Sequence, residues 1–416
     1  MQTILLALRN VFRNLRRSIL NILALTVGIS ILFLALGWIE GYNTYIFGTI
    51  IDTQTGHLQV LHEDYLDEQT RLPLDLLVRD YEATRSRIAE LPEVESAAGR
   101  LDFSVQLSVR DLAVRLFARA MDPAHEPEVT SIRHAIQQGS FAPDEPGILL
   151  GQALAERLDV ATGDTLFLTA TDSNGGTNFV DVTLRGIYEF GFGEFDRGTV
   201  MLDLATAERL VLTHDEVSAI AVRLAPRVDL EQGRQAVSGA VAQDGHAASR
   251  TAYETRTWRA FAQEIVSAIE ADMASFTVLI VLIGILIVIG IVNSTSMSVH
   301  ERTREIGTMR AIGMKRREVR RLFAAESLWI AGIAIVASAI ISTPIALWLQ
   351  ISGVDIAGLI PEGFPLPIGD AFYADFRLRH ALTALGLGVA ASLFSSITAI
   401  RRASRVQIVD ALRGRR

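Results

Sequence analysis

Four long apolar stretches divide the chain, and they are unevenly spaced. They cover Ile19–Ile39, Ala274–Met297, Ala324–Leu349 and Ala381–Ile400, so one lies near the start and three lie in the last third. A membrane-crossing helix needs about 20 apolar residues. No Asp, Glu, Lys or Arg lies in the middle of any of these stretches. The pattern predicts four transmembrane helices, with one large polar domain between the first and the second.

The polar domain mixes strand and helix patterns. Apolar residues alternate with polar ones over short runs, which indicates strands, and helical segments lie between these runs. Two strand–helix–strand units, at roughly 56–109 and 217–257, bracket a β-rich insert at about 112–216, and the turn Asp172–Thr177 predicts a hairpin within it. The mixture predicts an α+β domain. The expected strands lie within 56–61, 103–109, 164–168, 180–184 and 219–224, and the expected helices within 81–90, 153–158, 204–210 and 230–241.

The basic residues are concentrated in three short segments. Residues 1–18, 299–323 and 401–416 together hold 18 of the 39 Lys and Arg residues but only 4 of the 47 Asp and Glu residues. Short basic loops stay in the cytoplasm, whereas long domains cross largely regardless of charge. We therefore expect both termini and the loop 299–323 to lie inside, and residues 42–272 and the loop 350–380 to lie outside.

These observations predict an α-helical membrane protein with four transmembrane helices plus a large α+β extracytoplasmic domain between helices 1 and 2. We expect it in a bacterial inner (cytoplasmic) membrane, with the large domain in the periplasm. The first apolar stretch is longer than that of a cleavable signal, and no small-residue cleavage site follows Trp38, so it should remain as an anchor. The expected segments are a cytoplasmic amphipathic N-terminal segment (1–18), helix 1 (19–41), the periplasmic domain (42–272), helix 2 (273–298), a cytoplasmic loop (299–323), helix 3 (324–349), a periplasmic loop (350–380), helix 4 (381–400) and a cytoplasmic tail (401–416).

The polar domain contains no pattern of residues that we assign to catalysis. Its histidines lack the i, i+4 pairing of a metalloprotease helix, and no Gly-x-Ser-x-Gly occurs. The group His57, His62, Glu63 and Asp64 is interpreted as a solvated loop in preference to a metal site. Glu194 and Asp196, on a glycine-rich loop, are interpreted as turn residues. We therefore expect a non-catalytic chain that binds no metal, cofactor or nucleic acid.

The predicted spans contain only small polar residues in their interiors, such as Thr26, Ser30, Ser338 and Ser392. Such residues mostly help helices pack, and ion-coupled carriers place ionisable groups in the bilayer instead. The chain has one lysine, Lys315, which does not follow a glycine as the lysine of a phosphate-binding loop does. Energy should therefore come from a separate ATPase.

The cytoplasmic loop after the second span carries the sharpest local signal. As a helix, residues 301–313 would align Ile306, Met309 and Ile312 along one side with charges on the other, and Gly307 and Gly313 would permit a bend or a close approach. The pattern alone does not distinguish a helix that lies on anionic lipid from one that binds a protein partner.

The run Glu301-Arg302-Thr303-Arg304-Glu305-Ile306-Gly307, with Arg310-Ala311-Ile312-Gly313, closely resembles a signature of the FtsX/MacB/LolC–LolE superfamily of ABC transporter permeases. The topology of one span, a large outer domain and three spans is also similar to theirs. Segments of the outer domain resemble the lipoprotein-releasing LolC/LolE branch most, namely 121–126, 147–155, 163–164 and 193–196.

The resemblance implies a MacB-like permease fold and a dimer with a second copy or a paralogue. It also implies an ABC ATPase partner of the LolD or MacB type that binds ATP and Mg²⁺, contact with membrane lipid, and a periplasmic chaperone or adaptor as a candidate partner. It assigns ATPase coupling to the residues Glu301, Arg302, Arg304, Glu305, Ile306, Gly307, Met309, Arg310, Ile312 and Gly313. It also implies an apolar wall for an acyl chain between helices 1 and 2, with Phe33, Leu36, Ile280 and Ile283 as candidate contacts.

Three functions fit this resemblance. The leading hypothesis is mechanotransmission, in which the ATPase moves the outer domain to extract or release lipoproteins or another lipidated or amphipathic substrate. The second is MacB-like efflux of drugs or peptides. The third is an FtsX-like transmembrane regulator of a cell-wall hydrolase, whose outer domain should be smaller than this one.

Overall fold

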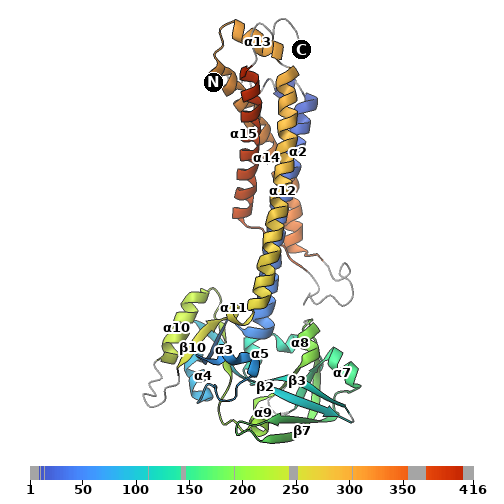
Figure 1. The fold of residues 1–416 in the computed structure, drawn as a ribbon, viewed down its shortest axis with the longest axis vertical. Helices are drawn as coiled ribbons and strands as arrows, with labels where there is room; N and C mark the ends of the chain where they lie inside the picture. Colours follow the sequence, from blue (N-terminus) through green and yellow to red (C-terminus); the bar gives the residue numbers. More distant parts are fainter. Residues whose placement is uncertain are drawn as a thin grey trace. The chain divides into compact units, whose positions relative to one another are not determined.

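The computed structural model describes residues 9, 11–13, 15–110, 112–141, 147–191, 193–242, 252–301, 303–354 and 372–405. The chain forms two compact units. The helical unit contains Met1–Tyr45, Ser267–Ile356 and Asp370–Arg416, and the sheet unit contains Ile46–Val266 and Ala357–Gly369. Figure 1 shows the helices and strands with their labels.

Four long helices and one short helix account for most of the described residues of the helical unit. They are α2 (Leu15–Ile50), α12 (Gln263–Glu301), α13 (Thr303–Ala311), α14 (Arg316–Ile351) and α15 (Leu378–Arg405), with the first residues of α12 and the last residues of α2 belonging to the sheet unit. Among the described residues, three stretches are long and apolar enough to cross a membrane: Ser18–Thr55, Ile269–Leu286 and Arg317–Ile351. A shorter apolar stretch, Leu378–Phe394, lies in α15.

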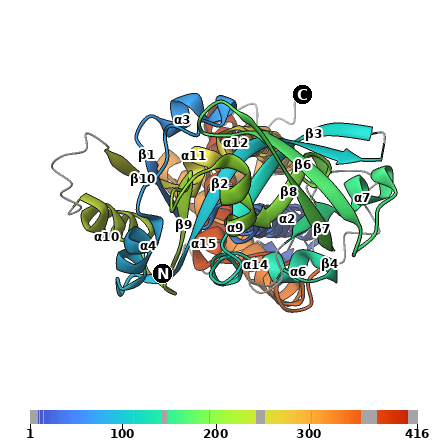
Figure 2. The same ribbon diagram turned by 90° about the horizontal axis from the view of Figure 1, so that it is seen from below.

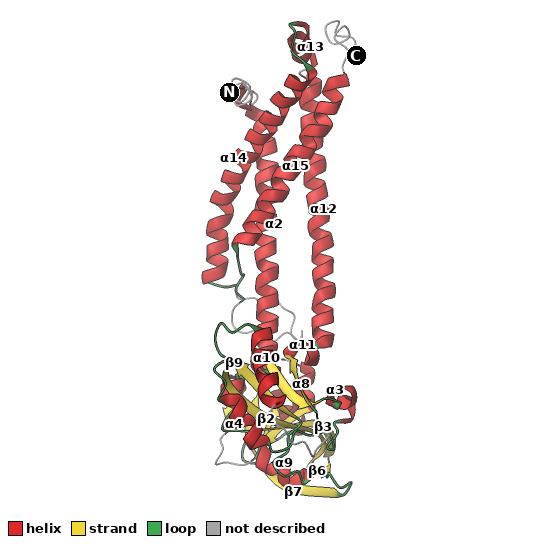
Figure 3. Cartoon of the chain, turned by 90° about the vertical axis from the view of Figure 1, so that its left-hand side faces the viewer, coloured by secondary structure: helices red, strands yellow, loops and turns green. Residues whose placement is uncertain are grey.

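Small polar residues join the long helices, as the sequence predicted. The Ser30 and Ser338 hydroxyls of α2 and α14 hydrogen-bond at 2.9 Å, and Thr26 donates to the Ala334 carbonyl at 3.4 Å. Small side chains let helix backbones approach closely, and hydroxyls bond across the interface without placing a charge there. Figure 3 shows α2, α14 and α15 running alongside one another.

The sheet unit is built on one mixed ten-stranded sheet. Its strand order is β10-β1-β9-β2-β3-β8-β5-β7-β4, with β6 pairing with both β2 and β7. The strands are β1 (Leu58–His62), β2 (Val94–Val109), β3 (Leu112–Met121), β4 (Ile136–Gly139), β5 (Ile148–Gly151), β6 (Thr165–Thr171), β7 (Thr177–Tyr188), β8 (Thr199–Asp203), β9 (Ala219–Leu224) and β10 (Tyr253–Thr257).

The two strand–helix–strand units interleave in this sheet. The first is β1, α4 (Tyr81–Ala89) and β2, and the second is β9, α10 (Leu230–Ala242) and β10. Strand β9 lies between β1 and β2 and is antiparallel to both, and β1 lies between β9 and β10. Figure 2 shows α4 and α10 together beside this half of the sheet. Their shared core includes Val60, Ile88, Ile220 and Val237.

The insert extends the sheet from the far half of β2. Residues Val94–Arg100 of β2 pair with β9, and residues Arg100–Val109 pair with β3. A second core of buried residues, including Phe103, Leu150 and Leu184, lies in this half. The predicted hairpin is confirmed, because β6 and β7 pair in antiparallel register across the turn at 172–176.

The remaining short helices connect these strands. They are η1 (Ile51–Thr55), α3 (Tyr65–Glu68), η2 (Gln69–Arg71), α5 (Glu126–Val129), α6 (Ile132–Ala135), α7 (Gln152–Leu158), α8 (Gly193–Gly198), α9 (Leu204–Val211) and α11 (Trp258–Phe261). Helix α9 begins where Asp203 accepts the Thr206 backbone N–H at 2.7 Å, which satisfies one of the free N–H groups of the first turn.

Candidate functional site

Within the helical unit, a pocket of about 420 Å³ lies between α2 and α12. We call it the α2–α12 pocket. It is lined by Trp38, Ile39 and Tyr42 from α2 and by Asp272, Met273, Ser275, Phe276 and Leu279 from α12. Most of these side chains are apolar, so the pocket can hold an apolar group away from water.

The α2 wall of this pocket is held in place by the residues that precede α15. The Trp38 and Phe372 rings pack at 4.4 Å between centroids, and the Asp375 backbone N–H donates to the Gly37 carbonyl at 3.0 Å. A Cβ atom on Gly41 would lie 2.5 Å from the Tyr373 carbonyl oxygen, so only glycine permits this approach. The segment Phe372–Arg377 is therefore packed directly on α2.

An acidic residue of α2, Glu40, adds charge to this contact. Its carboxylate forms an ion pair with Arg377 at 3.0 Å and a second one with Arg379, and it lies 3.8 Å from the His380 ring nitrogen. Arg377 also pairs with Asp375 at 2.7 Å. Networks of this kind fix geometry better than isolated surface pairs, so Glu40 sets the position of the segment along α2.

None of the four candidate substrate contacts is part of the lining of the α2–α12 pocket. Phe33 packs on Phe376 at 5.2 Å between ring centroids, so its ring is in contact with the segment before α15. Leu36, Ile280 and Ile283 are half-buried. Their contact with substrate stays a prediction.

The predicted coupling residues occupy the end of α12, all of α13 and the turn that follows. Gly307 is buried, Arg310 is half-buried and makes polar contacts, and Ile312 is 82% exposed. Gly313 has φ +105°, which favours glycine and turns the chain toward α14. Arg302 and the side chains of Glu301, Arg304, Ile306 and Met309 lie outside the described residues.

Glu305 has a partner that the sequence pattern did not indicate. The Arg13 Nη2 atom donates to both Glu305 carboxylate oxygens, at 2.8 and 2.9 Å. Both side chains are more than half exposed. The N-terminal segment is therefore tied to α13 by a bidentate ion pair at the surface.

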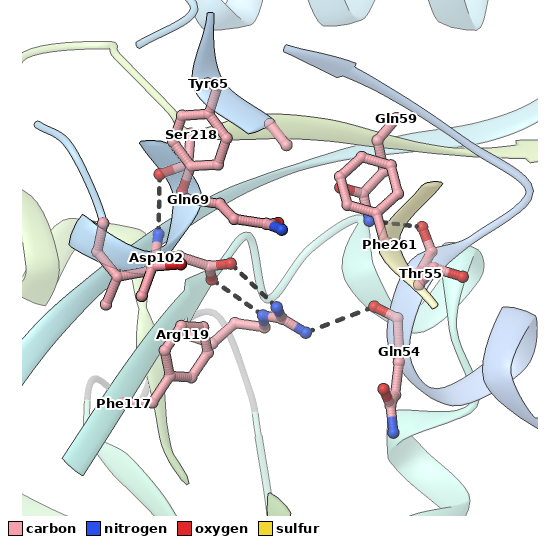
Figure 4. Close-up of a pocket in the computed structure, with 13 residues that line it drawn as sticks. Gln54, Thr55, Gln59, Tyr65, Gln69, Asp102, Phe117, Arg119, Ser218 and Phe261 are labelled. Atoms are coloured by element: carbon pink, nitrogen blue, oxygen red, sulfur yellow. Dashed lines mark hydrogen bonds and ion pairs between the residues drawn. The ribbon is translucent and has the colours of Figure 1, made fainter. Parts of the chain in front are cut away.

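A second pocket of about 420 Å³ lies in the sheet unit, and Figure 4 shows its lining. Arg119 donates to both Asp102 oxygens, at 2.9 and 3.0 Å, and its third nitrogen faces the Gln54 carbonyl at 3.5 Å. Burial raises the pKa of Tyr65, so its hydroxyl stays protonated. This hydroxyl lies near Ser218 but makes no hydrogen bond of good geometry among the described residues. Because Arg119 and Asp102 neutralise each other, the pocket has no free charge to act as an acid, a base or an anion site.

The histidines that were weighed as metal ligands have structural contacts. The His57 Nδ1 atom accepts the Leu224 backbone N–H at 3.3 Å, and the His62 Nδ1 atom accepts the Asp64 backbone N–H at 3.2 Å. Burial lowers the pKa of His57, which keeps it neutral. Within the described ranges, no three His, Cys, Asp or Glu side chains come together as metal ligands would.

Asp196 lies in helix α8 and not in the loop that the glycines suggested, and it holds the turn that precedes this helix. Its oxygens accept the Phe190 and Gly191 backbone N–H groups at 3.3 and 3.0 Å. Burial raises the pKa of this carboxyl to about 6. The side chain of Glu194 lies outside the described residues.

Comparison with known families shows to which family the chain belongs. A profile described as MacB-like periplasmic core domain matches residues 18–240, and one described as FtsX-like permease C-terminal matches residues 277–408. The chain belongs to the FtsX/MacB family of ABC transporter permeases. The resemblance drawn from residues 301–313 is thereby confirmed.

Relatives of this permease match along most of its length. The lipoprotein-releasing system transmembrane protein LolC of Neisseria meningitidis serogroup B is 22% identical over 95% of this chain and 94% of its own. LolE of Haemophilus influenzae is 21% identical over 94% of this chain and 92% of its own. The macrolide export ATP-binding/permease protein MacB of Bordetella avium is 24% identical over 80% of this chain and 50% of its own.

Among solved structures, the periplasmic region of MacB from Actinobacillus actinomycetemcomitans superposes with a TM-score of 0.40 at 9% identity. The match covers 53% of this chain and 97% of that one. Together the profiles and the apolar helices describe a membrane protein with a large extracytoplasmic domain.

The lining of the α2–α12 pocket was not predicted from the sequence of this permease. The signal that was available is the cluster of Trp38 and Tyr42 at the end of the first apolar stretch, opposite Asp272 and Phe276 at the start of the second. Aromatic residues with a polar tip favour such membrane boundaries. No pattern in the sequence indicated that Phe372 and Phe376 pack on α2, because this contact depends on the tertiary structure.

Proposed function

We propose that this permease works by mechanotransmission in a bacterial inner membrane, with both termini in the cytoplasm and the sheet unit in the periplasm. A partner ABC ATPase hydrolyses ATP, and the permease itself is non-catalytic. A second copy or a paralogue completes the dimer. Its substrate is a lipoprotein or another lipidated or amphipathic molecule at the outer face of the membrane.

The observation that carries this proposal is the α2–α12 pocket. It lies between the two helices that lead into the sheet unit, and its lining is mostly apolar, with Asp272 as its single carboxylate. A carrier that moved ions would need paired ionisable groups in this region. An apolar pocket beside lipid suits an acyl chain, and the LolC and LolE relatives are named for lipoprotein release.

The coupling surface in this proposal is α13 with the turn at Gly313. Ile312 is exposed there and needs an apolar partner, which an ATPase groove would supply. Replacing Ile312 with Asp should release the ATPase from the purified complex, because a charge would be buried without a partner. Replacing Glu305 or Arg310 by the opposite charge should do the same.

The experiment is co-purification of the ATPase with the full chain, together with the substrate-stimulated rate of ATP hydrolysis. The control is Leu212→Asp, which makes the same change at an exposed apolar position of the sheet unit. This control should keep the ATPase. If Ile312→Asp and the charge reversals kept both the association with the ATPase and the stimulated hydrolysis of ATP, α13 would not be the coupling surface.

Efflux of the MacB type is the second candidate, favoured by the match to MacB over 80% of this chain. Depletion of the permease distinguishes the two. Lipoprotein release predicts that lipoproteins accumulate in the inner membrane, whereas efflux predicts that sensitivity to a macrolide rises while lipoproteins reach their normal location.

A further inference from the structure

The α2–α12 pocket is amphipathic along its length. One part is formed by Ile39, Phe276 and Leu279, which are apolar. The other part is formed by the phenol of Tyr42 and the carboxylate of Asp272, which lie close enough to interact electrostatically. A ligand that fills both parts therefore needs an apolar tail and a polar head.

This polarity coincides with the predicted membrane boundary. The first two spans were predicted to cover 19–41 and 273–298, so Tyr42 and Asp272 are the first residues beyond the spans, whereas Trp38 and Phe276 are within them. Tryptophan and tyrosine are typical of such boundaries, where one end of the side chain is apolar and the other is wet. The tail of a bound amphiphile would lie at the level of the lipid chains and its head at their edge.

Asp272 determines which head groups are tolerated. It makes no hydrogen bond or ion pair among the described residues, and it is exposed to the pocket opening. The nearby acid Glu40 is already neutralised by Arg377 and Arg379. The pocket therefore presents one uncompensated negative charge to its ligand.

A lone carboxylate selects by both attraction and repulsion. It attracts a protonated amine and repels a phosphate, and at short range in a partly wet site each effect changes binding by about five- to tenfold. Ordinary membrane phospholipids carry a phosphate next to their chains. Asp272 would thus disfavour the bulk lipid that surrounds the pocket in large excess.

We propose that Asp272 makes the α2–α12 pocket selective for amphiphiles whose head is a protonated amine without a phosphate. This inference rests on the proposed function, since it names the head group of the lipidated substrate. Asp272 acts as a specificity-determining residue, and Trp38 and Phe276 hold the tail.

Trp38 provides the means to test this, because brominated chains quench tryptophan fluorescence on contact. The full chain in nanodiscs would be titrated with dibromostearylamine, dibromostearyl alcohol and dibromostearic acid. Subtracting the same titration of Trp38→Phe isolates the signal of Trp38 from that of the other three tryptophans. The variants are Asp272→Asn and, as the matched control, Glu270→Gln, which removes a charge two residues away on the same helix.

We expect the amine to quench Trp38 at about a five- to tenfold lower mole fraction than the alcohol, and the acid to be weaker than both. Asp272→Asn should make amine and alcohol equal without changing the alcohol titration, which also shows that the pocket is intact. Glu270→Gln should keep the preference for the amine.

Two results would overturn the inference while leaving the pocket as a lipid site. One is equal quenching by all three probes in the parent chain, and the other is a preference for the amine that survives Asp272→Asn. No quenching of Trp38 by any probe would contradict the proposed function as well, because the pocket would then not admit a chain.

Discussion

Replacing Glu126 with Gln should destabilise the sheet unit strongly, because it breaks a buried ion pair. Glu126 on α5 pairs with Arg100 on β2 through two contacts, at 2.6 and 3.2 Å, and its side chain is 1% exposed. Arg100 also donates to the Gln54 carbonyl of η1, and Thr130 donates to Glu126 at 2.8 Å. The pair therefore joins η1, α5 and the sheet at one buried point.

The size of the effect follows from burial. Removing one partner of a buried ion pair costs about 3–5 kcal/mol, because the remaining charge is left uncompensated. Glutamine keeps the shape and one acceptor oxygen, so one hydrogen bond survives and the lower end, about 3 kcal/mol, is expected. Since each 1.4 kcal/mol is a factor of ten, amide protection should fall about a hundredfold.

The assay is hydrogen exchange with mass spectrometry on the full chain in nanodiscs, read at the peptides of β2 and β9. The control is Glu128→Gln on the same short helix, where the carboxylate is exposed and accepts only Ser96 at 3.3 Å. This control should change protection by less than threefold. A loss below fivefold in Glu126→Gln, or an equal loss in the control, would show that water reaches Arg100 and that the reasoning from burial is wrong.

Three further predictions use other contacts. Burial raises the pKa of Asp196 to about 6, so its charged form destabilises the fold. As pH rises from 4 to 7, the free energy of unfolding of the parent should fall by up to about 3 kcal/mol relative to that of Asp196→Asn. Guanidinium unfolding of both proteins in detergent at the two pH values measures this, and a difference that does not change with pH would refute it. Gly41→Ala should displace the segment before α15 from α2, because the added methyl group would clash with it. The Asp375 amide should then lose its protection from hydrogen exchange. Unchanged protection of this amide would contradict the close approach. Exchanging Arg13 and Glu305 in a double variant should restore the ATPase co-purification that Glu305→Arg alone abolishes. The free energy of unfolding should change by less than about 1 kcal/mol, because the pair is exposed. Failure of the double variant to recover the ATPase would mean that Glu305 acts on the ATPase directly.

The elements of the sheet unit could largely be predicted from sequence periodicity. The expected strands within 56–61, 103–109 and 219–224 correspond to β1, the far half of β2 and β9, and the expected helix within 230–241 corresponds to α10. In the far half of β2 and in α10 one face is buried, so apolar residues recur with the period of the element, whereas β1 and β9 are buried on both faces and are short apolar runs. The family was likewise indicated by residues 301–313, a local signature that needs no knowledge of contacts.

The pairing of strands and the site could not be predicted in the same way. Nothing in the alternation within 219–224 indicates that β9 inserts between β1 and β2, because a strand with a buried face pairs equally well on either edge. The same limit applies to Arg13 and Glu305, which are 292 residues apart. An ion pair between exposed side chains leaves no periodic trace in the sequence.

The length of β2 has a consequence for anyone who dissects this permease into fragments. The strand has 16 residues, and its two halves serve different neighbours, with β9 along the first and β3 along the second. No boundary within this strand gives two stable fragments. Either fragment would expose unpaired backbone amide and carbonyl groups, which can pair with a strand of another molecule. Deleting the insert while keeping its flanks would expose the same unpaired strand edge. Fragments should therefore aggregate on expression, and the sheet unit is best expressed whole.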